Sequence, residues 1–257
     1  VPEGSFNITP QTPQVSPQTS VVPGAKSDQP QVIIPLDHAK TAGSIPDMTG
    51  GNTFRNSNAT GADGRERQHQ DPAARMLQEE LAKKGINAKI VRPEDFASYE
   101  EYDAYLKRMS DQGVMSVPLH FDAIQEGGGV GFLTRTRAGD SGDSALASPI
   151  NDVLRDFASQ NPELGRYSSD TMGNATVNMG AASPTALVEL GEMVRWEEQY
   201  GKNFTQSDKF RELIQGVAGG IVEGGNLKPG SDASVTSESS PSVLPKPVME
   251  KRVSVTP

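Results

Sequence analysis

The sequence predicts an α/β domain in which helices flank one largely parallel, mixed sheet, with extended proline-rich arms at both ends. Short apolar runs alternate with amphipathic segments through the middle of the chain, and strands that alternate with helices are typical of α/β layer folds. Eleven of the 19 prolines lie in residues 1–30 and 226–257, where proline disfavours helices. We therefore expect an arm at 1–30, one domain at 31–225 and a tail at 226–257.

Five short apolar runs predict the strands of the sheet. Each is bounded by glycine, proline or polar residues, as buried strands usually are. The runs are residues 32–36, 88–91, 114–119, 130–134 and 186–190. Pro35 and Pro118 interrupt two of them. Because proline removes a ladder hydrogen bond, we expect a bulge or an early end of the ladder at each.

Four amphipathic segments predict helices at about 71–84, 98–110, 148–157 and 207–223. Asp71 suits the N-cap of the first helix and Pro72 its first position, so Glu66 is expected on a turn before that helix. Ser148 and Pro149 similarly predict the start of the third helix. Residues 42–66 are rich in Gly, Asn, Ser and Thr, and a loop of that length inside a compact domain is more often functional than not.

Composition excludes several classes of protein. The chain has no cysteine, which excludes a disulfide scaffold and any Cys-ligated metal site. No apolar run approaches the ~20 residues of a membrane span. Taken together, the two ends carry five acidic and five basic side chains, so the net charge of −9 belongs to the middle. This charge argues against a sequence-blind nucleic-acid binder.

Two of the three histidines fall at the ends of predicted strands. His38 and His120 follow or end such runs, Glu189 lies within the last strand, and Glu66 precedes the first helix. Ligands gather at the carboxyl ends of strands in open α/β sheets. Two histidines and a carboxylate would make a catalytic zinc site, with a further carboxylate as base. Ordinary polar residues also occupy such positions, so the spacing alone leaves both interpretations open.

The order of these blocks resembles the zinc-dependent N-acetylmuramoyl-L-alanine amidases of the amidase-3 type. The resemblance spans about 31–224 and is carried by the strand before His38, the segment from Glu66 to Gly85, "SVPLHFDA" and "PTALVELG". It implies that His38, Glu66 and His120 bind Zn²⁺ and that Glu189 is the catalytic carboxylate. The implied reaction is hydrolysis of the amide between the lactyl group of N-acetylmuramic acid and L-alanine in peptidoglycan.

The sequence also departs from the family pattern, and these differences keep other functions than a zinc amidase open. "LDHAKTAG" lacks glycine on both sides of His38, and Asp122 stands where the family usually has Asn. The chain could therefore be a structural scaffold that kept the fold without catalysis, or another zinc hydrolase such as a peptidase. His69 is the substitute for Glu66 as a ligand, and otherwise a solvated histidine at the entry of the helix.

The composition of the two predicted arms indicates which partners the protein could contact and where it could act. Val, Ile and Leu lie among their prolines, so the arms are either flexible linkers or extended segments that contact a protein partner. An amidase core with such arms suggests a phage virion-associated lysin on a tail or baseplate, or else an extracellular, cell-wall enzyme. Peptidoglycan is the expected substrate, with no nucleic acid and no membrane span.

Overall fold

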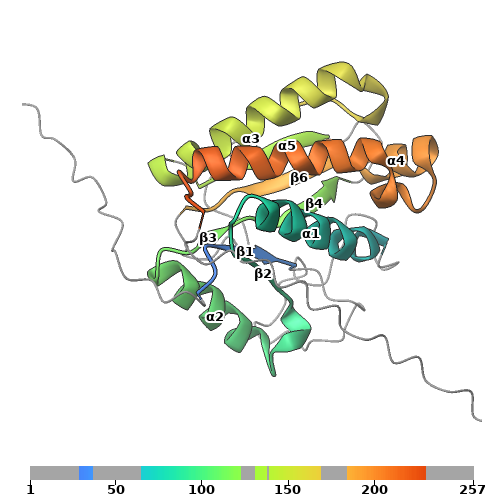
Figure 1. The fold of residues 1–257 in the computed structure, drawn as a ribbon. Helices are drawn as coiled ribbons and strands as arrows, with labels where there is room; N and C mark the ends of the chain where they lie inside the picture. Colours follow the sequence, from blue (N-terminus) through green and yellow to red (C-terminus); the bar gives the residue numbers. More distant parts are fainter. Residues whose placement is uncertain (1–28, 37–64, 123–130, 138, 169–183, 230–257) are drawn as a thin grey trace, which may run out of the picture.

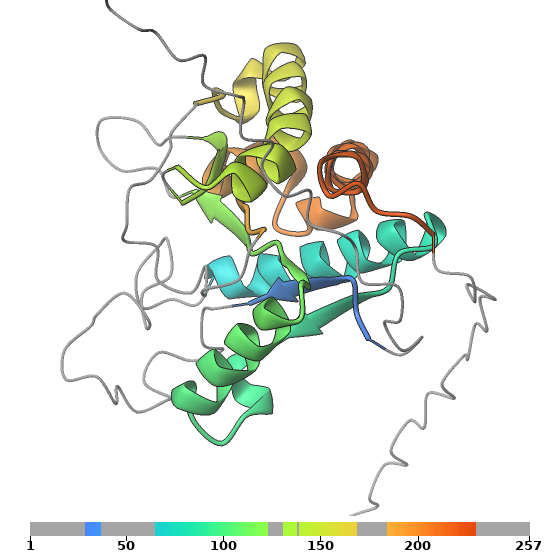
Figure 2. The same cartoon turned by 90° about the vertical axis from the view of Figure 1, so that its left-hand side faces the viewer.

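The computed structural model describes residues 29–36, 65–122, 131–137, 139–168 and 184–229. Most of both predicted arms, the loop at 42–64 and His38 lie outside these residues. The described part is an α/β fold whose helices lie on both faces of a mixed sheet (Figures 1 and 2). The predicted fold class is thus confirmed for the domain.

In the described residues, six strands form two three-stranded sheets. Their bounds are β1 Val32–Pro35, β2 Ala88–Val91, β3 Met115–Ser116, β4 Leu119–Asp122, β5 Phe132–Arg135 and β6 Leu187–Glu192. The strand orders are β2-β1-β3 and β4-β6-β5. All pairs are parallel except β5 with β6. The sheet is therefore mostly parallel with one antiparallel edge strand, as the sequence predicts.

Pro118 marks the point where the chain passes from one ladder to the other. The Val117 N–H donates to the Ile33 carbonyl of β1, whereas the Pro118 carbonyl accepts from the Val188 N–H of β6, both at 2.9 Å. A bridge between Ser116 and Thr185 joins the two ladders. The predicted strand 114–119 is consequently split into β3 and β4. The other proline, Pro35, is the last residue of β1, so that strand also ends early, as expected.

Within the part of the chain that the structure describes, five α-helices pack around the sheet. They are α1 Arg65–Lys83, α2 Tyr99–Asp111, α3 Ser141–Gln160, α4 Met193–Tyr200 and α5 Asp208–Gly224. Three short 3-10 helices, η2 Pro93–Asp95, η3 Pro162–Leu164 and η4 Phe204–Gln206, lie between them. Helices α1, α3 and α5 cover one face, and α2 packs on the other face beside β1 to β3 (Figure 2).

Two helix starts predicted from proline are wrong. α1 begins at Arg65, so Glu66 lies in its first turn and Pro72 is internal. α3 begins at Ser141 with Asp140 as its N-cap, and Pro149 is internal. In both helices the turns before the proline are fixed by tertiary contacts of buried side chains. These contacts outweigh the cost of an internal proline, about 3 kcal/mol.

The alternation of side chains along the strands divides the core. Val32 and Ile34 of β1 belong to the main core under α1, α3 and α5. Ile33 points to the opposite face and packs with Tyr102 and Leu106 of α2. Side chains of successive strand residues point to opposite faces, so any residue of this sheet that lies between two main-core residues faces away from α1, α3 and α5.

Helices α3 and α5 make the most extensive contact between two elements. Glycines of α5 allow this approach: a Cβ at Gly220 would lie 2.9 Å from the Ile150 nitrogen, and one at Gly224 would lie 2.5 Å from the Leu146 carbonyl oxygen. Both distances are below any normal contact. The glycines at the end of the predicted last helix thus serve close helix packing.

Candidate zinc and catalytic site

Glu66 is a buried carboxylate in the first turn of α1, with 1% of its surface exposed. Its Oε1 accepts the backbone N–H of Phe121 at 3.1 Å and the side-chain amide of Gln70 at 3.4 Å. Buried charges are kept only where such partners exist. The expectation of a turn outside the helix is therefore wrong, and the carboxylate instead enters the interior against β4.

His120 lies on β4 directly beside this carboxylate. Its Nδ1 is 3.2 Å from Glu66 Oε1, and 12% of its side chain is exposed. The structure thus brings together two of the three residues that the resemblance assigns as zinc ligands. The third, His38, lies outside the described residues.

Glu189 occupies the neighbouring position on the adjacent strand. In the parallel pairing of β4 with β6, His120 is the partner of Glu189. Leu119 and Phe121 on one strand, and Val188 and Leu190 on the other, belong to the main core. Because side chains alternate, His120 and Glu189 both project from the side of their strands opposite to these core residues.

The Glu189 carboxylate is buried rather than solvated, with 8% of the residue exposed. Arg135 of β5 lies at its edge, with Nε 3.9 Å from Glu189 Oε1. A guanidinium at this distance offsets the charge of a carboxylate that the sheet holds away from water. This arrangement suits a carboxylate that must be ionised in order to take a proton.

The proximity of Arg135 to Glu189 is a feature of the site that the sequence alone does not predict. The segment from Arg135 to Asp143 has the composition of a mixed-charge loop, yet Arg135 ends β5 and Asp143 is fully buried in α3. Asp143 accepts from Arg137 Nη2 at 2.7 Å and from the Thr185 N–H at 2.7 Å. It thus ties the start of α3 to the chain just before β6. Leu133 is the partner of Glu189, so alternation puts Arg135 on the same sheet face as Glu189, but the sequence alone shows neither the pairing nor its register.

His69 is neither solvated nor beside His120. Only 5% of its surface is exposed, and its Nε2 lies 3.0 Å from Glu197 Oε1 of α4. Its ring packs against Phe204 at 4.5 Å between centroids. This pair joins α1 to α4 and η4.

Two of the three residues that the resemblance assigns to zinc lie close enough together to share one ion. Two ligand atoms that are each about 2.0–2.2 Å from a tetrahedral zinc lie about 3.3–3.5 Å apart, close to the 3.2 Å between His120 Nδ1 and Glu66 Oε1. The hydrogen bonds to Glu66 resemble the outer partners that orient metal-binding carboxylates. Within the described residues, no group of three or more His, Asp or Glu side chains could hold a metal, so a complete set needs a ligand such as His38.

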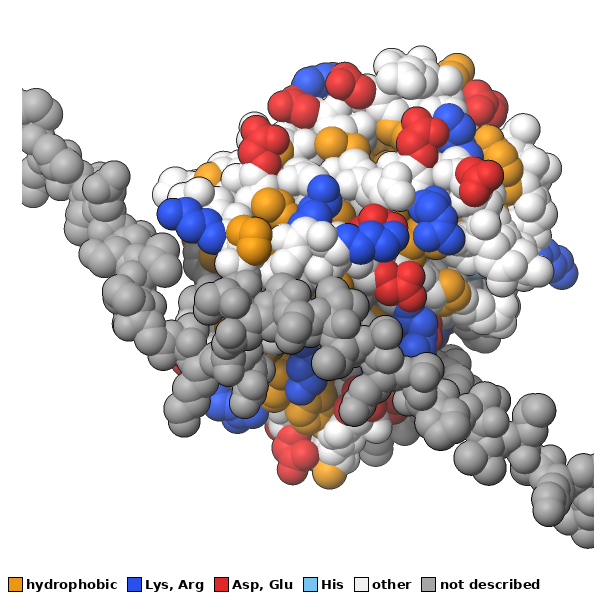
Figure 3. Space-filling model, in the orientation of Figure 1, with side chains coloured by type: hydrophobic (Ala, Val, Ile, Leu, Met, Phe, Trp, Pro, Cys, Tyr) orange, Lys and Arg blue, Asp and Glu red, His pale blue; other side chains and the backbone are white. Residues whose placement is uncertain are grey.

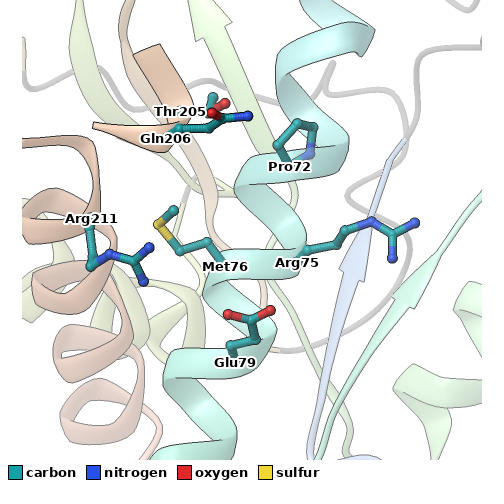
Figure 4. A pocket seen from close by; sticks show the side chains of 7 residues that line it. All are labelled: Pro72, Arg75, Met76, Glu79, Thr205, Gln206 and Arg211. Atoms are coloured by element: carbon teal, nitrogen blue, oxygen red, sulfur yellow. The ribbon is translucent and has the colours of Figure 1, made fainter. Parts of the chain in front are cut away.

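A separate groove of about 250 Å³ lies between α1, η4 and α5 (Figure 4). Its lining contains none of the predicted site residues. The lining residues are Pro72, Arg75, Met76, Glu79, Thr205, Gln206 and Arg211. The Arg75 guanidinium points away from the groove in Figure 4 and binds Asp71. The groove is therefore distinct from the candidate site.

On the face shown in Figure 3, acidic and basic side chains are interspersed over α3 and α5, and neither sign forms a continuous patch. Among the helices that the structure describes, none combines the length and the hydrophobicity required to span a bilayer.

Solved structures with a similar fold include N-acetylmuramoyl-L-alanine amidases. Ami1 of Mycobacterium abscessus has a TM-score of 0.52 at 18% identity, covering 75% of this chain and 97% of that chain. AmiC2 of Nostoc punctiforme has a TM-score of 0.49 at 17% identity, covering 77% and 97%. The sequence matches no protein-family model and no curated protein. The similarity to Ami1 shows that the chain shares the amidase fold.

Proposed function

We propose that this chain is a zinc-dependent N-acetylmuramoyl-L-alanine amidase. The observation that carries the proposal is the convergence of Glu66, His120 and Glu189 from α1, β4 and β6. The resemblance of the sequence assigns these three residues to the site, and the fold shared with Ami1 supports the same class of enzyme. The substrate would be peptidoglycan, cleaved between the lactyl group of N-acetylmuramic acid and L-alanine.

His38, Glu66 and His120 would hold the zinc ion in this proposal. When bound, zinc would polarise the attacking water and the amide carbonyl. Glu66 is kept in place by the Phe121 N–H, and the backbone of β4 carries His120 directly beside it. These two residues would therefore need no movement of α1 relative to β4 in order to share one ion.

Glu189 would act as the general base and then as the general acid. Its carboxylate takes a proton from the attacking water and returns it to the amine of the leaving L-alanine. Burial of Glu189 limits competing water, and Arg135 offsets its negative charge before the proton arrives. The fixed strand pairing of Glu189 with His120 holds the base next to a ligand, as proton transfer in the site requires.

Zinc analysis and digestion of purified muropeptides would test this function. A zinc amidase contains about one zinc per chain and releases peptides with a free N-terminal L-alanine. A chain that binds no zinc and cleaves nothing would be the structural scaffold. Zinc with cleavage inside the peptide would indicate a peptidase on the same fold, so each alternative gives a distinct result.

We further propose that the enzyme is part of a phage tail or a similar assembly and acts on the cell wall from outside. The proline-rich composition of 1–30 and 226–257 supports protein partners for both arms. Proteomic analysis of purified virions would test this location, because a virion component is enriched with the tail proteins. Recovery only in the soluble extracellular fraction would contradict it.

A further inference from the structure

Gln70 connects the Glu66 carboxylate to the strand that carries His120. It lies one helical turn after Glu66 on α1 and is fully buried. Residues four apart on a helix lie above one another on the same face. The Gln70 amide nitrogen donates to the Leu119 carbonyl at 2.9 Å and to Glu66 Oε1 at 3.4 Å.

The contacts of Glu66 and Gln70 enclose His120 on both sides along β4. Leu119 precedes His120 and receives the Gln70 bond, whereas Phe121 follows His120 and donates its N–H to Glu66. One amide therefore fixes both the carboxylate rotamer and its position along the strand. Outer-shell partners of this kind orient metal ligands and strengthen metal binding.

The oxygen of the Gln70 side-chain amide, unlike its nitrogen, makes no hydrogen bond within the described residues. This Oε1 atom is also buried. A buried polar atom without a partner costs stability, and a methionine of similar shape would avoid that cost while filling the same space. Packing alone therefore does not explain an amide at this position.

We propose that Gln70 is a positioning residue that holds the Glu66 carboxylate in the orientation required for zinc binding. This inference rests on the proposed function, because it assigns Glu66 as a ligand. Gln70 touches neither substrate nor reacting atoms in this account and acts through Glu66. Its effect is on metal affinity first and on turnover only as a consequence.

The test compares zinc affinity, measured by chelator competition on the full chain, between Gln70→Met and wild type. A loss of about 10–100-fold is expected, as for other outer-shell partners of metal ligands. Gln78→Met is the matched control: Gln78 is also on α1, and its amide donates to a strand carbonyl, that of Ala88, at 2.7 Å. The control should lose a similar bond and retain wild-type zinc affinity.

A second variant covers the case in which Gln70→Met fails to fold. Gln70→Asn keeps an amide but is one carbon shorter, so it also loses the bridge and is expected to weaken zinc binding. Folded Gln70 variants with wild-type zinc affinity, or an equal loss in Gln78→Met, would overturn the positioning role alone. Absence of zinc from the wild-type chain would instead overturn the proposed function.

Discussion

The imidazole Nδ1 of His120 lies 3.2 Å from Oε1 of Glu66, although the two residues belong to different elements, β4 and α1. Glu66 also accepts the N–H of Phe121, the residue after His120. The carboxylate is therefore fixed to the strand at the same point where the histidine projects. Both the proposed metal site and the proposed role of Gln70 depend on this relationship.

Replacement of Glu189 by glutamine is expected to leave the fold and zinc content unchanged and to abolish most turnover. The amide has nearly the same shape but cannot take a proton from water, and general acid–base help is worth about 10²–10⁴-fold. Steady-state hydrolysis of a muropeptide measures the loss. Turnover within threefold of wild type would remove Glu189 from the mechanism.

Loss of the His120 imidazole is expected to strip the metal rather than to slow chemistry alone. His120→Ala removes one of three proposed ligands, so zinc content after dialysis should fall well below one per chain. The control is His69→Ala, which removes a histidine engaged by Glu197 and should keep its zinc. Stoichiometric zinc in His120→Ala, or its loss only in His69→Ala, would show that the ligand assignment is wrong.

Asp71 is expected to contribute to stability in a pH-dependent way. Partial burial raises the pKa of Asp71, but the hydrogen bonds and charges of Arg92 and Arg75 outweigh this effect and leave the pKa below its usual value. A depressed pKa in the folded state stabilises above the unfolded value, about 3.9, and this stability is lost as pH falls through the folded pKa.

Urea unfolding of wild type and Asp71→Asn between pH 7 and pH 2.5 measures this effect. The difference in unfolding free energy should be constant above about pH 5 and shrink below it. Arg92→Leu removes the strongest partner of Asp71 and should show the same trend. A difference that stays constant down to pH 2.5 would argue against the ion pair.

Alanine substitutions at two adjacent glycines of α5 are expected to change the stability of the fold in opposite directions. Gly220→Ala places a Cβ 2.9 Å from the Ile150 nitrogen and should push α5 from α3, at a cost of about 1–3 kcal/mol. Gly219 has no atom within 4 Å of a built Cβ, so Gly219→Ala should stabilise the helix by about 0.5–1 kcal/mol. Thermal unfolding measures both, and equal effects would contradict the packing described.

Much of the fold could be predicted because its strands are short, apolar and separated by clear breaks. The run 88–91 coincides with β2, and the last predicted helix, 207–223, differs from α5 by one residue at each end. The break at Pro118 could also be predicted, since proline cannot donate to the ladder. These features depend on local chemistry alone.

The rest depended on tertiary contacts that a single sequence does not display. α1 extends six residues before Asp71, because Glu66, His69 and Gln70 find buried partners there. The 3.2 Å contact of Glu66 with His120 followed from the family resemblance and not from spacing. Arg135 was missed because only the antiparallel pairing of β5 with β6 brings it near Glu189.

Mass spectrometry of muropeptides digested by zinc-loaded wild type and by Glu189→Gln tests the account most directly. The account predicts that wild type releases peptides with a free N-terminal L-alanine, together with glycan that retains intact lactyl groups. The zinc-loaded variant should release almost none. Intact substrate with wild type, or cleavage at a bond other than the lactyl–alanine amide, would contradict the account.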